Sequence, residues 1–83
     1  MSSADTAPIK ILIVDDEAGV RELLKDALKL AGFETQAAND GMSALTALRS
    51  YTPDIMIIDI NMPLMDGFEL VERLRKNGND IPV

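Results

Sequence analysis

The sequence has no cysteine, no histidine and no tryptophan, and its aromatic side chains are one tyrosine and two phenylalanines. Without cysteine the chain forms no disulfide and offers no thiolate to a metal ion, which agrees with a reducing compartment. Without histidine it also lacks a second common ligand of zinc and copper. A metal site built from the acidic side chains would therefore offer only hard oxygen atoms.

Basic residues are scarce, with eight lysines and arginines against fourteen acids, a net charge of −6 and a pI of about 4.3. A protein that grips a nucleic-acid backbone needs clustered basic side chains, so we expect no direct nucleic-acid contact. No apolar run reaches the length of a membrane span, and the polar start MSSADTAPIK has no signal-peptide core. These absences predict a cytoplasmic domain that does not bind membranes.

The residues that are present describe one small domain. The hydrophobic fraction of 47% is that of a folded protein, and the small polar residues 1–8 predict a flexible tail ahead of a domain over residues 9–83. Apolar β-branched runs predict strands, and apolar residues at helical spacing predict helices. The strands are expected at residues 9–14, 33–38 and 55–58, and the helices at residues 17–31, 41–50 and between Asp66 and Asn77.

Turn and capping residues mark the predicted ends of the helices. Gly32 is expected to stop the first helix, Asn39 or Asp40 to cap the second, and Asp66 to cap the third with Glu69 as its capping-box partner. The apolar side chains expected to pack inward are Val20, Leu23, Leu24, Ala27, Leu28, Ala31, Ala44, Leu45, Leu48, Phe68, Leu70, Val71 and Leu74, together with Met42, Met62 and Met65.

The alternation of strands and helices predicts the fold class. Strand and helix units at this spacing form a parallel sheet, so we expect an α/β protein. Residues 81–83 are interpreted as the start of a fourth strand. The carboxyl ends of parallel strands lie along one edge of the sheet, where such folds bind their ligands.

Acidic side chains directly follow two of these strands. Asp15 and Asp16 come after the first strand and Asp59 after the third, and in the commonest doubly wound order these strands are neighbours. The three carboxylates are then expected to meet, and their mutual repulsion favours a bound cation. Hard oxygen ligands suit Mg²⁺ or Ca²⁺, and an aspartate at such a metal can be the nucleophile toward a phosphoryl group.

A plainer interpretation exists for each of these residues. Asp15 and Asp16 can simply stabilise the positive end of the first helix, and Asp59 can cap the turn that follows its strand. Pro63 and Gly67 are ordinary turn residues. On this interpretation the acids are structural and bind nothing.

Two segments carry a resemblance to a known family. IKILIVDDE at the first strand and IMIIDINMPLMDG at the third closely resemble the receiver domain of bacterial two-component response regulators. The resemblance covers residues 9–83 and implies a flavodoxin-like doubly wound parallel sheet. It also implies that Asp59 accepts a phosphoryl group from a sensor histidine kinase, which makes the domain a signalling module rather than an enzyme.

The resemblance further implies a magnesium site. In the family pattern Asp16 and Asp59 ligate Mg²⁺ directly, Asp15 acts mainly through water, and Asn61 offers its backbone carbonyl. The family also has a serine or threonine and a lysine that contact the phosphoryl group, and no positions of this sequence match them. We therefore expect the N-terminal part of a receiver domain, with an incomplete sheet of three strands and three helices plus the start of a fourth strand.

Two other functions compete with phosphoryl acceptance. The first is a truncated receiver fragment that is inactive in phosphotransfer and acts as a structural or self-association unit, as a homodimer or through strand swapping. The second is a magnesium phosphatase of the haloacid-dehalogenase type, which also uses an aspartate at a strand end. That family needs the pattern D-x-D after its first strand, whereas here Asp15 is followed directly by Asp16.

Overall fold

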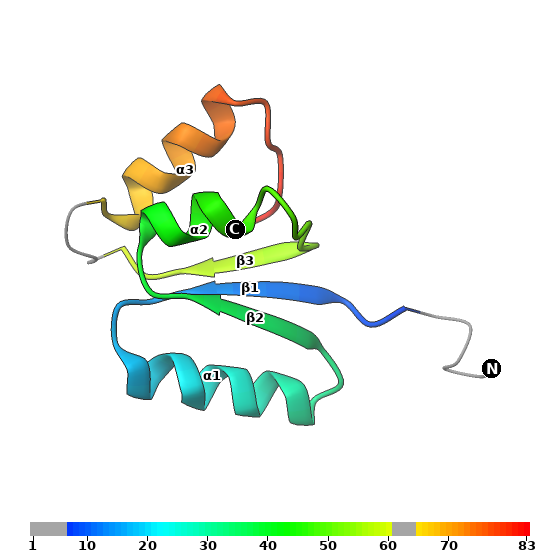
Figure 1. Ribbon diagram of the computed structural model, residues 1–83. Helices are drawn as coiled ribbons and strands as arrows, with labels where there is room; N and C mark the ends of the chain where they lie inside the picture. The colour runs from blue at the N-terminus through cyan, green and yellow to red at the C-terminus, as the bar shows by residue number, and fades with distance from the viewer. Residues whose placement is uncertain (1–6, 61–64) are drawn as a thin grey trace.

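The computed structural model describes residues 7–60 and 65–83, in which strands and helices alternate along the chain (Figure 1). The elements are β1 (Lys10–Val14), α1 (Ala18–Leu30), β2 (Glu34–Ala38), α2 (Gly41–Ala47), β3 (Ile55–Ile58) and α3 (Gly67–Lys76). The three complete strands and three helices that were predicted are present, although α2 is shorter than expected and ends at Ala47 rather than Ser50. Within the described part of the chain, no helix has the length and apolar character needed to cross a membrane.

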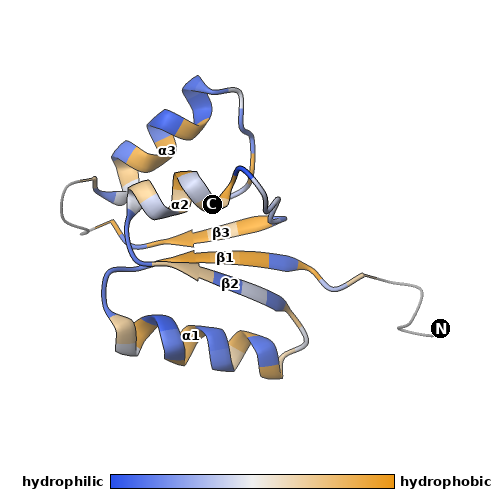
Figure 2. Cartoon of the chain, in the orientation of Figure 1, coloured by the Kyte–Doolittle hydropathy of each residue, from blue (hydrophilic) through white to orange (hydrophobic). Residues whose placement is uncertain are grey.

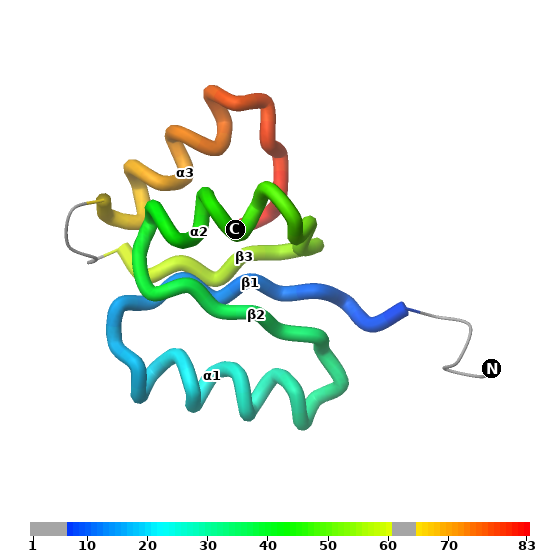
Figure 3. The backbone as a smooth tube through the Cα atoms, viewed as in Figure 1, coloured from blue at the N-terminus to red at the C-terminus, as the bar shows by residue number. Residues whose placement is uncertain are grey.

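The sheet is parallel, and β1 lies in the middle of the strand order β2-β1-β3. Val14 at the end of β1 pairs with Ala38 of β2 and with Ile58 of β3, so the three strands end in register. Residues 11–14 of β1 are buried, as their continuous apolar run predicted. The loops that follow the three strands therefore leave from the same end of the sheet (Figure 3).

Helices cover both faces of this sheet. α1 lies on one face, and α2 and α3 lie on the other (Figure 1). The main core is formed between the sheet and the α2 and α3 face, around Leu12, Met56 and Leu70. Its other buried members are Val14, Ala38, Ala44, Tyr51, Met65 and Leu74. This arrangement confirms the predicted α/β fold with a flavodoxin-like, doubly wound parallel sheet.

The face under α1 is less well covered. α1 packs against β1 and β2, and Figure 2 shows that polar and apolar residues alternate around it. Leu24 is half-buried, but Leu23 is 70% exposed. Ile55 and Ile57 of β3 are also exposed on this side, because alternate strand residues point to opposite faces and Met56 points into the core. The expectation of an inward-facing stripe is therefore wrong for its exposed members, Val20, Leu23, Ala27 and Ala31.

Side-chain caps fix the starts of α2 and α3. Oδ1 of Asp40 accepts a hydrogen bond from the Ser43 amide at 2.6 Å, and Oδ1 of Asp66 accepts one from the Glu69 amide at 2.8 Å. The Ser43 amide bond is also the main cause that lowers the pKa of the Asp40 carboxyl. Gly32 follows the end of α1 with a φ of 98°, a conformation that glycine adopts without strain. These three predicted helix boundaries are confirmed.

Other expectations are corrected by the structure. Met42 and Phe68 are 57% and 70% exposed, so neither packs in the core, and Met62 lies outside the described residues. Residues 81–83 form no regular strand. The Met56 amide donates to the Pro82 carbonyl at 2.8 Å, which places this segment along the edge of β3. Pro82 also has no N–H to donate to a neighbouring strand, which disfavours a regular ladder at this position.

Candidate acidic metal site

Three carboxylates meet at the carboxyl-terminal end of the sheet. Asp15 and Asp16 follow the last residue of β1, and Asp59 follows the last residue of β3. β1 and β3 are adjacent and end in register, so one oxygen atom from each of the three carboxylates lies within 4.8 Å of the others. The structure thus brings together the three acids that the sequence analysis singled out.

Backbone hydrogen bonds hold the two acidic loops beside one another. The amide of Asp59 donates to the carbonyl of Val14 at 2.8 Å, and the amide of Asp15 donates to the carbonyl of Ala38 at 3.2 Å. Both acids therefore extend the hydrogen-bonded sheet by one residue. Asp15 and Asp59 are half-buried and Asp16 is exposed, so a small ligand can approach the cluster from solvent.

Asp15 also has a structural role in its own loop. Its Oδ1 accepts a hydrogen bond from the Glu17 amide at 2.9 Å, and its backbone carbonyl accepts one from Nη1 of Arg21 at 2.8 Å. Glu17 is the N-cap residue of α1 but makes no side-chain capping bond. One carboxylate oxygen of Asp15 therefore stabilises its own loop, in line with the plainer interpretation. The same carboxylate also belongs to the acidic cluster.

The donor set of this cluster fits a hard divalent cation. All three side chains offer carboxylate oxygens, which are the ligands that Mg²⁺ and Ca²⁺ prefer in proteins. A divalent cation would also offset the repulsion between three negative charges held this close together. Asn61 and Pro63 lie outside the described residues, so the carbonyl ligand expected at Asn61 stays a prediction.

Sequence reasoning missed one contact between elements, that of Met65 with Gly41. Met65 is 4% exposed and belongs to the main core, where it meets the first residue of α2, Gly41. The expectation that Met65 packs was right, but its partner on a separate element has no local sequence signal.

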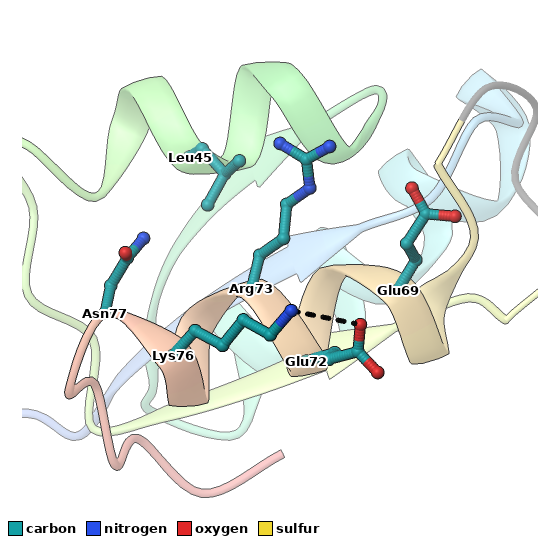
Figure 4. A pocket seen from close by; sticks show the side chains of 6 residues that line it. All are labelled: Leu45, Glu69, Glu72, Arg73, Lys76 and Asn77. Carbon is teal, nitrogen blue, oxygen red and sulfur yellow. Dashed lines mark ion pairs between the residues drawn. The ribbon is translucent and has the colours of Figure 1, made fainter.

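A separate hollow lies between α2 and α3 (Figure 4). It is lined by Leu45, Glu69, Glu72, Arg73, Lys76 and Asn77. Nζ of Lys76 lies 3.9 Å from Oε1 of Glu72 in an exposed pair one helical turn apart, a type of contact that contributes little to stability. None of the three clustered carboxylates lines this hollow, so it is not part of the acidic site.

The fold and the site together define a small parallel α/β domain with an acidic cluster at the carboxyl end of its sheet. The model of the family described as the response regulator receiver domain matches residues 11–83. The chain therefore belongs to the response regulator receiver domain family.

Several relatives illustrate this similarity. Response regulator MprA from Mycobacterium sp. (strain KMS) is 40% identical over 76 residues, which are 92% of this chain and 33% of the relative. The receiver domain of the Francisella response regulator 1452 has a TM-score of 0.86 and 34% identity, covering 93% of this chain and 63% of that chain. The chain thus spans about a third of the length of the curated relatives that it matches.

A third relative was solved with a metal. Response regulator protein TrrA from Thermotoga maritima, in complex with Mg(2+)-BeF, has a TM-score of 0.77 and 43% sequence identity to this chain. The similarity covers 82% of this chain and 59% of that one.

Proposed function

We propose that this chain is the phosphoacceptor module of a two-component response regulator and takes a phosphoryl group from a sensor histidine kinase onto Asp59. The observation that carries the proposal is the meeting of the Asp15, Asp16 and Asp59 carboxylates at the end of the sheet. Membership of the receiver domain family supports it.

We propose Mg²⁺ as the cation of the site. Asp16 and Asp59 would hold it directly, and Asp15 would act mainly through water. The oxygen-only donor set supports this choice, and so does the complex of the related TrrA with Mg²⁺. When bound, Mg²⁺ offsets the negative charge of an incoming phosphoryl group. The contribution of Asn61, which lies outside the described residues, remains a prediction from the family resemblance.

Asp59 is the nucleophile in this proposal. One of its carboxylate oxygens bonds to the phosphorus of a phosphohistidine as the P–N bond of the donor breaks. The electron pair of that bond stays with the histidine nitrogen, which takes up a proton, and Asp59 becomes an acyl phosphate. The chain is then a phosphoryl acceptor rather than a conventional enzyme. We also place this reaction in the cytoplasm, as the sequence analysis predicted.

Intact mass spectrometry tests this function. The parent chain, Asp59→Asn and Asp26→Asn are each incubated with phosphoramidate and Mg²⁺. Asp26 is an exposed acid of α1 outside the cluster, so its variant is the matched control. We expect the parent and Asp26→Asn to gain one phosphoryl group that hydroxylamine removes, and Asp59→Asn to gain none. A gain in Asp59→Asn, or no gain in the parent, would overturn the assignment.

Self-association is a second candidate function. It is favoured by the apolar side chains exposed on the α1 side of the sheet, Leu23 at 70% and Ile57 at 37%. In that case the acids are idle, and the chain acts as a structural unit. A Mg²⁺ titration separates the two candidate functions. If the acids are idle, the parent chain and Asp59→Asn respond to Mg²⁺ in the same way.

A further inference from the structure

Two glycines border the connection between Asp59 and α3. Gly67 is the first residue of α3 and Gly41 is the first residue of α2, and both are buried. Neither has a positive φ. The reason for glycine at these two positions is therefore the space around them rather than the backbone conformation.

Gly67 touches the backbone of the site itself. A Cβ atom at this position would lie 2.7 Å from the carbonyl oxygen of Asp59 and 2.8 Å from Cα of Ile60, distances that real Cβ atoms essentially never show. The Gly67 amide also donates to the Ile60 carbonyl at 3.4 Å. The first turn of α3 thus rests directly on the residue that carries the Asp59 carboxylate.

Gly41 makes an equally close contact with Met65. A Cβ atom at Gly41 would lie 2.6 Å from Sδ of Met65 and 3.0 Å from both its Cβ and its Cγ. Met65 is 4% exposed within the main core, and a closely packed core leaves a side chain little room to shift. Met65 directly precedes Asp66, the N-cap of α3. A displaced Met65 would therefore displace the start of α3.

We propose that Gly41 is a positioning residue for the acidic site. α2 supplies no carboxylate to the cluster, yet through Met65 it sets where α3 begins, and through Gly67 it sets where the Asp59 backbone lies. The predicted change in Mg²⁺ affinity rests on the proposed function, whereas the predicted shift of the backbone amide signals does not. Residues that support metal ligands from outside typically change metal affinity about tenfold or more when they are altered.

NMR spectroscopy of the whole chain tests the proposal. The backbone amide signals of Asp59 and Gly67 are followed during a Mg²⁺ titration of the parent, Gly41→Ala, Met65→Ala and the double variant. Gly41→Ala is expected to move both signals without metal and to weaken Mg²⁺ binding about tenfold. Gly19→Ala is the matched control, because a Cβ atom at Gly19 would meet nothing within 4 Å, and it is expected to leave both readouts unchanged.

The double variant separates positioning from a general loss of stability. Met65→Ala alone removes the contact and should also weaken Mg²⁺ binding. The double variant should bind Mg²⁺ better than either single variant, because the new Cβ at position 41 enters space that the sulfur has left. If Gly41→Ala does not fold, Met65→Ala and the double variant can still be compared with the parent.

Each outcome decides the proposal. If Gly41→Ala lowers the urea midpoint while the Mg²⁺ affinity of the folded chain and the Asp59 signal stay at their parent values, Gly41 is merely structural and the proposal is wrong. If the parent itself binds no Mg²⁺, the proposed function fails. In that case the metal-free signals of Asp59 and Gly67 alone decide whether α2 positions the site.

Discussion

At the scale of single residues, the three clustered carboxylates have different surroundings. Asp15 is half-buried and uses one oxygen to accept the Glu17 amide. Asp59 is half-buried, and its amide is tied to β1. Asp16 is the exposed member of the cluster. The three acids are therefore not interchangeable, and single substitutions distinguish their contributions.

Asp16 and Glu17 form a matched pair for testing the metal ligands. Asp16→Ala removes a clustered carboxylate, whereas Glu17→Ala removes a neighbouring acid that lies outside the cluster. Isothermal titration calorimetry is expected to give at least about a tenfold loss of Mg²⁺ affinity for Asp16→Ala. The loss for Glu17→Ala should be much smaller. Equal losses would show that Asp16 is not a direct ligand.

Tyr51 is predicted to make the folded chain less stable at alkaline pH. Burial, followed by the negative charge of Glu34, raises the pKa of its hydroxyl above the ordinary value of 10.0. The folded chain therefore prefers the neutral phenol. Its contribution to stability is complete below about pH 10 and is lost as the pH rises through the raised pKa.

Urea unfolding over a series of alkaline pH values checks this prediction. Tyr51→Phe should remove the part of the pH dependence that begins above pH 10, so the difference between parent and variant isolates the tyrosine. Tyr51 is the only tyrosine in the chain, so the absorbance of tyrosinate reports its ionisation directly. An ionisation midpoint at the ordinary value in the folded parent would contradict the prediction.

At the scale of the elements, helix boundaries were easier to predict than helix faces. Asp66 caps α3 as expected, because an N-cap is a local interaction between residues three apart. Which face of a helix turns inward is harder to predict, because it depends on how the helix is rotated against the sheet. Leu70 and Leu74 point into the core, whereas Phe68, two residues from Leu70, is turned away and exposed.

Leu70 and Phe68 test this rotation of α3. Leu70 is fully buried, so Leu70→Ala is expected to lower the free energy of unfolding by about 2–5 kcal/mol through lost contacts and a cavity. Phe68→Ala should change it by less than about 0.5 kcal/mol, because that side chain is 70% exposed. Urea unfolding followed by circular dichroism measures both. Similar costs for the two variants would mean that α3 is rotated differently.

At the scale of the whole molecule, the two faces of the sheet are unequal. The face covered by α2 and α3 contains the main core. On the other face α1 covers β1 and β2, and the apolar side chains of Ile55 and Ile57 on β3 remain exposed. Leu23 of α1 is exposed as well. Exposed apolar side chains on this side of the sheet could contribute to an interaction surface if they lie together.

Self-association through this face is testable by analytical ultracentrifugation. We expect the average mass of the parent to rise with concentration. A Leu23→Glu, Ile57→Glu double variant should raise the dissociation constant at least about tenfold, because association would bury unpaired charges. Met42→Glu is the control, since Met42 is 57% exposed on α2, across the sheet. A parent that stays monomeric at all concentrations would rule out this second candidate function.

Features that depend on neighbours along the chain could be predicted from the amino-acid sequence. These are the bounds of most strands and helices, the caps at Asp40 and Asp66, the glycine after α1, and the acids directly after β1 and β3. Periodicity, capping and turn conformation operate over a few residues, so their signals can be seen in a single sequence. The motifs around Asp15 and Asp59 indicated the family for the same reason.

Contacts between distant segments follow from the folding of the whole chain. The meeting of Asp59 with Asp15 and Asp16 follows from the pairing of β1 with β3, which the sequence analysis had to assume from the commonest strand order. The contact of Gly41 with Met65 and the exposure of Ile55 and Ile57 on β3 have no local signal at all. They result from packing between elements far apart in sequence, where volume and shape select the arrangement.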